Sequence, residues 1–280
     1  MQTIGILGCG LMGSGIAQVC AQSGYRTVVR EVDQSLLDQG LGRIEKFLND
    51  GVKRSKVSTE DRDKAMANLS GTTQVADLAE VDIIIEAIVE NLQAKQKIFT
   101  ALDGVVKDDT LFASNTSSLC ITEMASATKR PDRFLGLHFF SPVPVMKLVE
   151  VIRGLATSDE TYNRGMSFAA SLGKEPITAP DRPGFIVNRL LIPYLLDAIR
   201  AYESGVGTIE DIDQGMSVGC GHPMGPFTLL DFVGLDTTYY IANIMYEEFR
   251  DAAYASPPLL KRMVSAGRLG RKTGQGFYKY

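Results

Sequence analysis

The sequence predicts an α/β domain with a doubly wound sheet, followed by an all-helical C-terminal domain. A strand-like run at 2–7 leads through a glycine-rich turn into a helix, which is typical of the first unit of a parallel sheet. Strand and helix patterns then alternate over most of the first 183 residues. From Phe185 on, only helical spacing of apolar residues is found. We therefore expect one domain over 1–183 and a second over 184–280.

The composition of the 280-residue chain is that of a globular protein, 45% hydrophobic and 22% charged. A net charge of −4 argues against a nucleic-acid-binding surface. No apolar run approaches the roughly 20 residues that span a bilayer, so we expect no membrane association. The chain starts directly with a strand, so we expect no signal or transit peptide. The four cysteines are far apart and lack the spacing of a metal site, which favours reduced thiols in a cytoplasm.

The glycine-rich turn follows the pattern G-x-G-x-x-G, which is meaningful because a strand precedes it and a helix follows. Gly8 permits the tight turn, Gly10 lets the backbone approach a pyrophosphate, and Gly13 allows close helix–strand packing. The helix, expected to start at Ile16, supplies amide donors and a partial positive charge. The sequence thus predicts a Rossmann-type domain. Its expected cofactor contacts at this turn are Gly8, Gly10, Leu11, Met12 and Gly13.

The second strand, expected over Thr27–Glu31, ends in an acid. Glu31 lies roughly 20 residues beyond the first glycine, where a dinucleotide fold places a carboxylate to accept the adenosine ribose hydroxyls. A carboxylate repels a 2′-phosphate, which favours NAD over NADP. Arg30 beside it can pair with such a phosphate, so NADP stays open as the alternative.

Between Asp33 and Val81 there is more chain than one crossover helix needs. Apolar residues at helical spacing over 36–48, and a helix-start signal at 58–61, predict a helix–turn–helix insertion over about 34–70. Its tip is cationic. Two interpretations stay open: a solvated charged turn, or a grip on the phosphates of a large acyl carrier. The tip residues are Lys53, Arg54 and Lys56.

Two further strands are expected at 81–87 and 110–114. A tip rich in hydroxyl and amide groups, Asn115 to Ser118, follows the second strand, at the edge where open α/β sheets bind ligands. We interpret Ser117 as facing the ligand. The alternative is that Ser117 or Ser118 caps the helix expected from Ile121.

The segment from Gly136 to Glu150 is where chemistry is expected. Two short apolar runs flank a proline-rich break centred on Pro144. If the runs pair antiparallel about that centre, His138 and Glu150 lie opposite one another with Cβ atoms roughly 5 Å apart. A carboxylate that fixes the tautomer and stabilises the imidazolium makes histidine a general acid/base. The alternative is a half-buried strand histidine satisfied by a surface glutamate.

The segment 176–184 is rich in proline and glycine and is expected to join the two domains. Long helical runs are expected over 188–203, 209–218 and 226–249. Asn188 starts the first of them, so its side chain can face the cleft. Pro193 should kink this helix or mark its first turns. His222 is expected to cap or pack within a loop rather than catalyse.

The helical domain carries many apolar side chains for its length. Part of that surface is therefore expected to be shared with a second copy of the chain. The residues on which this expectation rests are Leu190, Leu191, Leu195, Leu196, Ile199, Leu229, Leu230 and Phe232.

Taken together, these segments resemble the L-3-hydroxyacyl-CoA dehydrogenase family, in its short, stand-alone 3-hydroxybutyryl-CoA dehydrogenase form. The resemblance covers essentially the whole chain and its set of motifs is highly specific. The segments that carry it are 8–15, 86–91, 112–119, 136–150, 183–189, 222–226 and 270–278.

The resemblance implies hydride transfer between NAD(H) and carbon 3 of an acyl-CoA thioester, with His138 as acid/base and Glu150 as its partner. It implies that Ser117 and Asn188 hold the reacting oxygen and that the basic tip meets coenzyme A. It also implies a homodimer and a place in fatty acid metabolism. The further positions that it implies beside the cofactor are Glu90, Lys95, Asn115, Ser117, Ser141 and Lys272.

The sequence departs from the family pattern at two positions. Ser141 stands where relatives usually have asparagine, so a cofactor contact made by that amide is shortened or water-bridged here. Glu31 stands where aspartate is common, which keeps the charge but lengthens the reach.

Two rival functions remain open. The first is a dehydrogenase of the same build that acts on a free hydroxy acid or sugar acid, and the basic tip argues against it because such a substrate has no distant phosphates. The second is a non-catalytic dinucleotide-binding protein. The joint presence of the four predicted catalytic residues argues against that rival.

Overall fold

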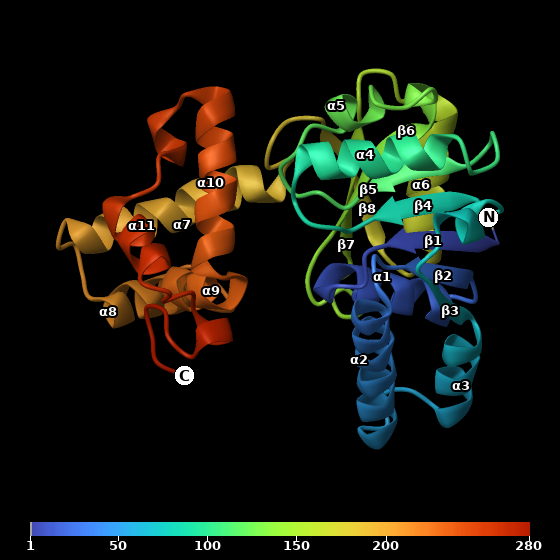
Figure 1. Cartoon of the computed structure of the whole chain (residues 1–280). Coiled ribbons are helices and arrows are strands. Elements are labelled where there is room, and N and C mark those ends of the chain that lie inside the picture. The colour runs from blue at the N-terminus through green and yellow to red at the C-terminus, as the bar shows by residue number, and fades with distance from the viewer. Residues whose placement is uncertain (1) are drawn as a thin grey trace. The chain divides into compact units, whose positions relative to one another are not determined.

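The computed structural model describes residues 2–280, which form two compact units divided between Asp181 and Arg182. The expected domain boundary lies two residues further along the chain. Each unit is described here by itself, and both are drawn in Figure 1.

The first unit is built on one eight-stranded sheet, with the strand order β3-β2-β1-β4-β5-β6-β7-β8. The strands from β3 to β6 in this order are parallel, β7 is antiparallel to β6, and β8 is parallel to β7. This is the predicted Rossmann-type sheet. The strands are β1 (Thr3–Leu7), β2 (Arg26–Arg30), β3 (Leu69–Thr72), β4 (Ile83–Glu86), β5 (Leu111–Ser114), β6 (Phe134–Phe139), β7 (Leu148–Arg153) and β8 (Glu175–Pro180).

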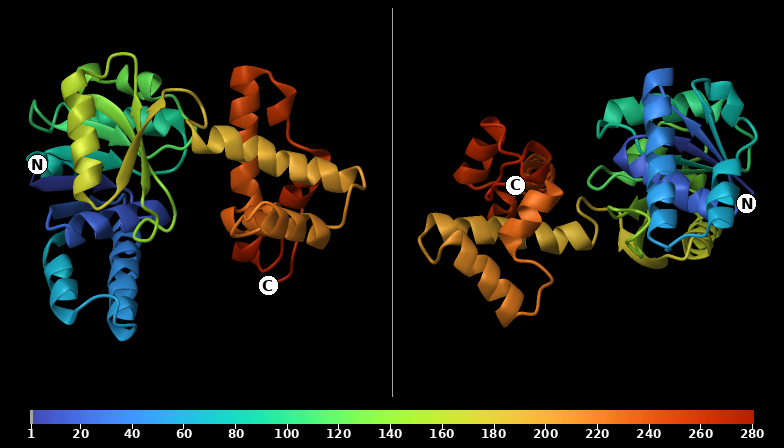
Figure 2. Two further views of the ribbon diagram at one scale, coloured as in Figure 1. Left: turned by 180° about the vertical axis from the view of Figure 1, so that it is seen from behind. Right: turned by 90° about the horizontal axis from the view of Figure 1, so that it is seen from below.

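Helices cover both faces of this sheet. In Figure 1, α4 lies in front of the strands, whereas α6 lies in front when the molecule is turned by 180° in Figure 2. The central strands are buried throughout, as expected of parallel strands covered on both faces. The helices of this unit are α1 (Leu11–Gln22), α2 (Gln34–Lys53), α3 (Thr59–Ala67), α4 (Leu92–Asp103), α5 (Ile121–Ala125) and α6 (Asp159–Ser171).

Three local expectations were wrong. The first helix starts at Leu11, directly after the second glycine of the motif, and not at Ile16. Strand β3 was not predicted, because its sequence Leu-Ser-Gly-Thr lacks apolar alternation and it pairs with β2 through its backbone. Strand β8 occupies half of the proline-rich segment expected to be a joint, as an edge strand, where proline is tolerated.

The predicted helix–turn–helix insertion is confirmed as α2 and α3, which project together from the sheet in Figure 1. Ser58 caps α3, because its side chain accepts a hydrogen bond from the N–H of Asp61. The guanidinium of Arg62 donates to the side-chain oxygen of Asn49 at 2.9 Å, which ties the second helix to the first.

The second unit is helical, as predicted. Pro193 lies inside its first helix. The run expected over 226–249 is divided into two helices at Gly234, whose φ of +101° strongly favours glycine. In the part of the chain that the structure describes, no helix is both long and apolar enough to cross a membrane. The α-helices are α7 (Val187–Glu203), α8 (Ile209–Gln214), α9 (Pro226–Val233), α10 (Leu235–Phe249) and α11 (Pro258–Ser265).

The C-terminal tail is fastened to a buried carboxylate of α9. Asp231 is 1% exposed and accepts hydrogen bonds from the backbone N–H groups of Phe277 and Tyr278 at 2.9 and 2.8 Å. The hydroxyl of Tyr280 donates to the same carboxylate at 3.2 Å. A second buried acid, Asp213, accepts from the hydroxyl of Tyr278 at 3.0 Å. Burial, with Asp213 beside it, raises the pKa of Tyr278, so this phenol stays protonated and keeps donating.

The start of α5 is capped from far away in the sequence. The carboxylate of Asp181 accepts from the backbone N–H groups of Ile121 and Thr122, both at 2.8 Å. The alternative interpretation, in which Ser117 or Ser118 caps this helix, is therefore wrong. A charged side chain reaches the two donors instead, which leaves the serine-rich tip outside the cap.

Asp181→Ala should lower the free energy of unfolding by about 1–2 kcal/mol, because it removes a side-chain cap and leaves backbone donors unpaired. Chemical denaturation of the purified protein measures this change. Asp132→Ala is the matched control, because this exposed acid lies 3.9 Å from Arg133, and surface pairs of this kind change stability by roughly 0.5 kcal/mol or less. Equal stability of the Asp181 variant and the wild type would contradict the cap.

Candidate functional site

A histidine and a glutamate face each other across the two antiparallel strands. His138 of β6 and Glu150 of β7 are register partners, which confirms the predicted pairing. Nδ1 of His138 lies 2.6 Å from Oε2 of Glu150, and the two side chains are 8% and 0% exposed. An ionised carboxylate can only accept a hydrogen bond, so Nδ1 carries the proton and Nε2 is the ring nitrogen that can exchange one.

The polar tip after β5 lies beside this pair. Oδ1 of Asn115 accepts a hydrogen bond from the backbone N–H of Phe139 at 2.9 Å, which fastens the tip to the residue next to His138. The backbone N–H of Ser117 donates to Oε1 of Glu90 at 3.1 Å. The main chain of Ser117 is thus held in place, while the role of its hydroxyl at the substrate stays a prediction.

A buried group of charges supports the tip. Nζ of Lys95 lies 2.6 Å from Oε1 of Glu86 and 3.0 Å from Oε2 of Glu90. The side chains of Lys95 and Glu86 are 1% and 0% exposed. Burial raises the pKa of the Glu86 carboxyl, whereas the Lys95 ammonium and a hydrogen bond from Ser114 oppose that rise. A buried ammonium between two carboxylates is well compensated, because each charge meets its opposite.

Glu90 connects the buried charges to the tip. Its carboxylate accepts hydrogen bonds from the hydroxyls of Thr116 and Ser118 as well as from the backbone of Ser117. Lys95 was expected beside the cofactor, and the structure adds that it holds Glu90. The contacts of these two residues with the cofactor stay predictions.

The glycine-rich turn has the shape that a dinucleotide requires. Leu11 and Met12 lie in the first turn of α1, and no side chain caps that helix. A Cβ atom at Gly10 would meet nothing within 4 Å, so there is room beside the helix N-terminus. Gly8 has a φ of +86°, and a Cβ atom at Gly13 would lie 1.9 Å from the carbonyl oxygen of Gly8. These residues fit the pyrophosphate of NAD.

The acid after β2 points back to this turn. Oε1 of Glu31 accepts a hydrogen bond from the N–H of Cys9 at 2.6 Å, and Oε2 accepts one from the N–H of Val32 at 2.9 Å. The carboxylate therefore lies next to the glycine-rich turn, as expected of the acid that binds the adenosine ribose. Its contact with the ribose stays a prediction.

The basic tip of the insertion is exposed. Nζ of Lys53 lies 3.4 Å from Asp50, and its side chain is 77% exposed. Within residues 2–280, no ion pair involves Arg54 or Lys56. Lys56 lines a hollow of about 530 Å³ beside the end of α1 and the helix α3. Both earlier interpretations of the tip, solvated turn and phosphate grip, are compatible with this exposure.

Two predicted site residues belong to the second unit. Asn188 is half-buried near the start of α7, and Nζ of Lys272 lies 2.6 Å from Oδ1 of Asp236. Their roles at the site stay predictions. His222 packs, as expected: its Nδ1 lies 3.2 Å from the hydroxyl oxygen of Tyr194, and the two rings meet edge to face.

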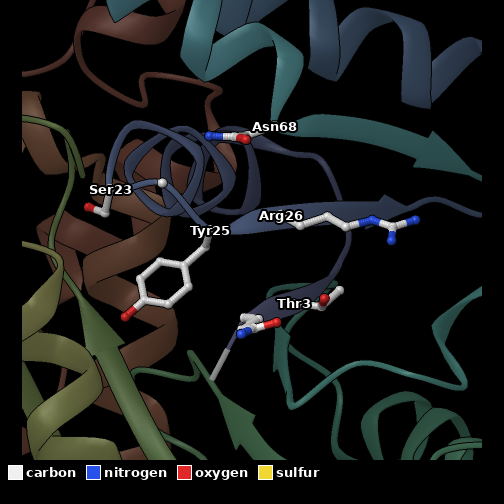
Figure 3. Close-up of a pocket in the computed structure, with 7 residues that line it drawn as sticks. Thr3, Ser23, Tyr25, Arg26 and Asn68 are labelled. Atoms are coloured by element: carbon white, nitrogen blue, oxygen red, sulfur yellow. The ribbon is translucent and has the colours of Figure 1, made fainter.

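A hollow of about 560 Å³ opens where β1 and β2 begin (Figure 3). The glycine-rich turn lies at the other end of β1, after its last residue. Open α/β sheets bind ligands at the carboxyl ends of their strands. This hollow therefore lies outside the candidate site. Its lining residues are Gln2, Thr3, Ser23, Gly24, Tyr25, Arg26 and Asn68.

Sequence reasoning gave no role to Glu86 or to Thr116. Glu86 holds Lys95 beneath the polar tip after β5, and Thr116, within that tip, donates a hydrogen bond to Glu90. An acid at the end of an otherwise apolar strand, Ile-Ile-Ile-Glu, was a usable signal for Glu86. Thr116 gave no such signal within its hydroxyl-rich segment. Among the described residues, no group of three or more acidic, histidine or cysteine side chains could hold a metal ion.

Comparison with known proteins gives matches over the whole chain. Residues 3–182 match the NAD binding domain of 3-hydroxyacyl-CoA dehydrogenase, and residues 184–280 match its C-terminal domain. A 3-hydroxybutyryl-CoA dehydrogenase of Mycobacterium tuberculosis is 49% identical, with 100% of this chain and 99% of that protein covered. The human mitochondrial hydroxyacyl-coenzyme A dehydrogenase is 46% identical, with 98% and 90% covered.

Solved structures agree with these matches. The crystal structure of (S)-3-hydroxybutyryl-CoA dehydrogenase from Ralstonia eutropha superposes with a TM-score of 0.96 at 45% identity, covering 100% of this chain and 99% of that one. The family's NAD binding domain and the shape of the glycine-rich turn together identify the cofactor as NAD. With both domain models matched and the buried histidine–glutamate pair at the predicted register, the chain belongs to the 3-hydroxyacyl-CoA dehydrogenase family, a family of oxidoreductases.

Proposed function

We propose that this protein interconverts (S)-3-hydroxyacyl-CoA and 3-ketoacyl-CoA with NAD(H), and that its principal pair is 3-hydroxybutyryl-CoA and acetoacetyl-CoA. The observation that carries the proposal is the contact of 2.6 Å between His138 and Glu150, at the carboxyl edge of a sheet that also bears the glycine-rich turn. The names of the relatives in Mycobacterium tuberculosis and Ralstonia eutropha support the choice of acyl group.

His138 performs the proton transfer in this proposal. Bound NAD⁺ supplies the acceptor for the hydride that leaves carbon 3 of the substrate. Nε2 of His138 removes the hydroxyl proton, and Glu150 stabilises the imidazolium that forms. In the reverse direction the protonated ring returns the proton to the ketone oxygen. Glu150 is 0% exposed, so its attraction for the imidazolium is little weakened by water.

Ser117 and Asn188 position the reacting oxygen. A hydroxyl and an amide both donate hydrogen bonds to an oxygen that gains negative charge, whichever direction the reaction takes. The firm attachment of the tip through Asn115 and Glu90 supports this role for Ser117, because a donor acts well only when its backbone is fixed.

We propose a cytoplasmic location as part of this function. All four cysteines are free, and Cys220 is exposed. Free thiols in a chain of this size are typical of a reducing compartment.

The proposed function is tested with a substrate panel. Acetoacetyl-CoA with NADH should give the highest kcat/KM, while free acetoacetate should be turned over poorly because it lacks the phosphates that the tip can bind. NADPH should give a lower kcat/KM than NADH, because Glu31 repels a 2′-phosphate. Efficient reduction of free acetoacetate would favour the rival free-acid dehydrogenase. No turnover of any substrate would favour the non-catalytic rival. A higher kcat/KM with NADPH than with NADH would mean that Arg30 governs the cofactor site.

The catalytic pair is tested by its pH dependence. His138→Ala should lower kcat roughly 100- to 10,000-fold, the usual loss for a general base, and Glu150→Gln should lower it less. A base must be neutral to act, so wild-type oxidation should rise with pH and reduction should fall. Glu150→Gln removes the charge that favours the imidazolium, so the midpoint of both profiles should move to lower pH. Deuteride transfer verifies that chemistry limits the rate, and coincident midpoints would show that Glu150 is not coupled to proton transfer.

The basic tip is tested by charge reversal. Lys56→Glu and Arg54→Glu should each raise KM for the CoA thioester, by roughly fivefold or less for the lost contact plus the repulsion of the new charge. Affinity for NADH should stay nearly unchanged. Lys129→Glu, at an exposed position outside the insertion, makes the same charge change as a control. An unchanged thioester KM in both tip variants would return the tip to its interpretation as a solvated turn.

We expect a homodimer that forms through the helical unit. Four of the leucine and isoleucine side chains first expected at the dimer interface are not available for it, because they are fully buried within that unit. They are Leu195, Leu196, Ile199 and Leu230. Leu190 and Phe232 are 72% and 46% exposed, and Val206 and Val218 are also exposed. Light scattering at micromolar concentration should give twice the mass of one chain. A mass equal to that of one chain under those conditions would contradict this expectation.

A further inference from the structure

A buried lysine with no role in the proposed chemistry contacts the loop that joins the two strands of the catalytic pair. Lys174 precedes β8 and is 9% exposed. Its Nζ donates hydrogen bonds to the carbonyl oxygens of Val143 and Met146, at 2.5 and 2.8 Å. Both carbonyls belong to the β6–β7 turn, which we define as residues 141–147. The ammonium thus bridges two points of the segment that connects His138 to Glu150.

This contact is not a surface ion pair. Among the described residues, no ion pair includes Lys174. The ionisable group that faces it from α1 is Cys20, a fully buried thiol whose pKa is raised by burial. Burial also lowers the pKa of Lys174. Burial of an ammonium against two carbonyl oxygens, with no carboxylate in contact, costs folding free energy. The contact is therefore better explained by the position that it gives the turn than by a gain in stability.

The β6–β7 turn touches the cofactor side of the domain. Val143 is 2% exposed and packs closely on α1. A Cβ atom added at Gly15 of that helix would lie 2.9 Å from the Cβ atom of Val143. The turn is also internally tight, because the N–H groups of Val145 and Met146 both donate to the carbonyl of Pro142 at 2.9 Å. A shift of this turn would therefore move Ser141 and the start of α1 together.

We propose that Lys174 is a positioning residue for the cofactor. Its ammonium fixes the β6–β7 turn against α1, and this sets where Ser141 and the first turn of α1 lie when NAD(H) binds. The inference rests on the proposed function for the role of Ser141. Lys174 acts on cofactor binding and not on proton transfer, because its two hydrogen bonds end on the turn and leave the contact between His138 and Glu150 intact.

The test is the affinity for NADH of Lys174→Met, which keeps most of the length of the side chain and removes the ammonium that donates both hydrogen bonds. The dissociation constant, measured by fluorescence titration, should rise about tenfold, which corresponds to a loss of about 1.4 kcal/mol of binding free energy. The pH midpoint of kcat should equal that of the wild type. Lys147→Met is the matched control, because this lysine lies in the same turn and its side chain is 76% exposed.

If the folded Lys174→Met protein binds NADH with a dissociation constant within twofold of that of the wild type, the inference is overturned. This holds even if the thermal stability of the variant is lower. If that variant does not fold, Lys174→Gln replaces it under the same criterion. Gly15→Ala tests the turn from its other side, because the added methyl must displace Val143, and unchanged NADH affinity there would also overturn the inference. Failure of the wild type to bind NADH or to reduce acetoacetyl-CoA would instead refute the proposed function.

Discussion

The site depends on one constraint, the register of β7 against β6. Side chains alternate between the two faces of a strand, so a slip of one residue would put Glu150 on the opposite face from His138. The length of the β6–β7 turn sets that register, and the hydrogen bond from the backbone N–H of Phe139 to the side chain of Asn115 fixes β6 against the neighbouring tip. A parallel return of the chain would have needed a crossover of a dozen or more residues. The antiparallel hairpin instead brings acid and base together over a short loop.

A second constraint is the cost of burying charge beneath the tip. Lys95 and Glu86 are both almost wholly removed from water, and each is compensated by its partner and by hydrogen bonds. Replacement of such a pair by apolar residues is often neutral for stability, whereas removal of one member is costly. The pair also carries Glu90 and, through it, the backbone of Ser117. Its position under the polar tip after β5 favours a role in placing side chains over a role in stabilising the fold.

Much of this arrangement could be predicted because the deciding signals were local. The symmetry of the segment about Pro144 was enough to pair His138 with Glu150, and Ser58 marked the start of α3. Apart from the start of α1, which was placed five residues too late, the errors came from long-range contacts. The cap of α5 comes from Asp181, far along the chain, so no local pattern could have removed Ser117 and Ser118 from that role. Strand β3 forms because β2 offers an open edge, which its own residues do not reveal. Lys174 precedes an edge strand like many solvated lysines, and only the fold places its ammonium under the turn.

The fastening of the C-terminal tail has a consequence for handling the protein. Asp231 is buried in α9, and its donors come from Phe277, Tyr278 and Tyr280. Without residues 277–280 that carboxylate would have fewer donors at a position that is 1% exposed. A buried acceptor left unpaired costs about 1–3 kcal/mol, and more when it is charged. Removal of residues 277–280 should therefore lower the stability of the helical unit itself, although Tyr280 is 54% exposed.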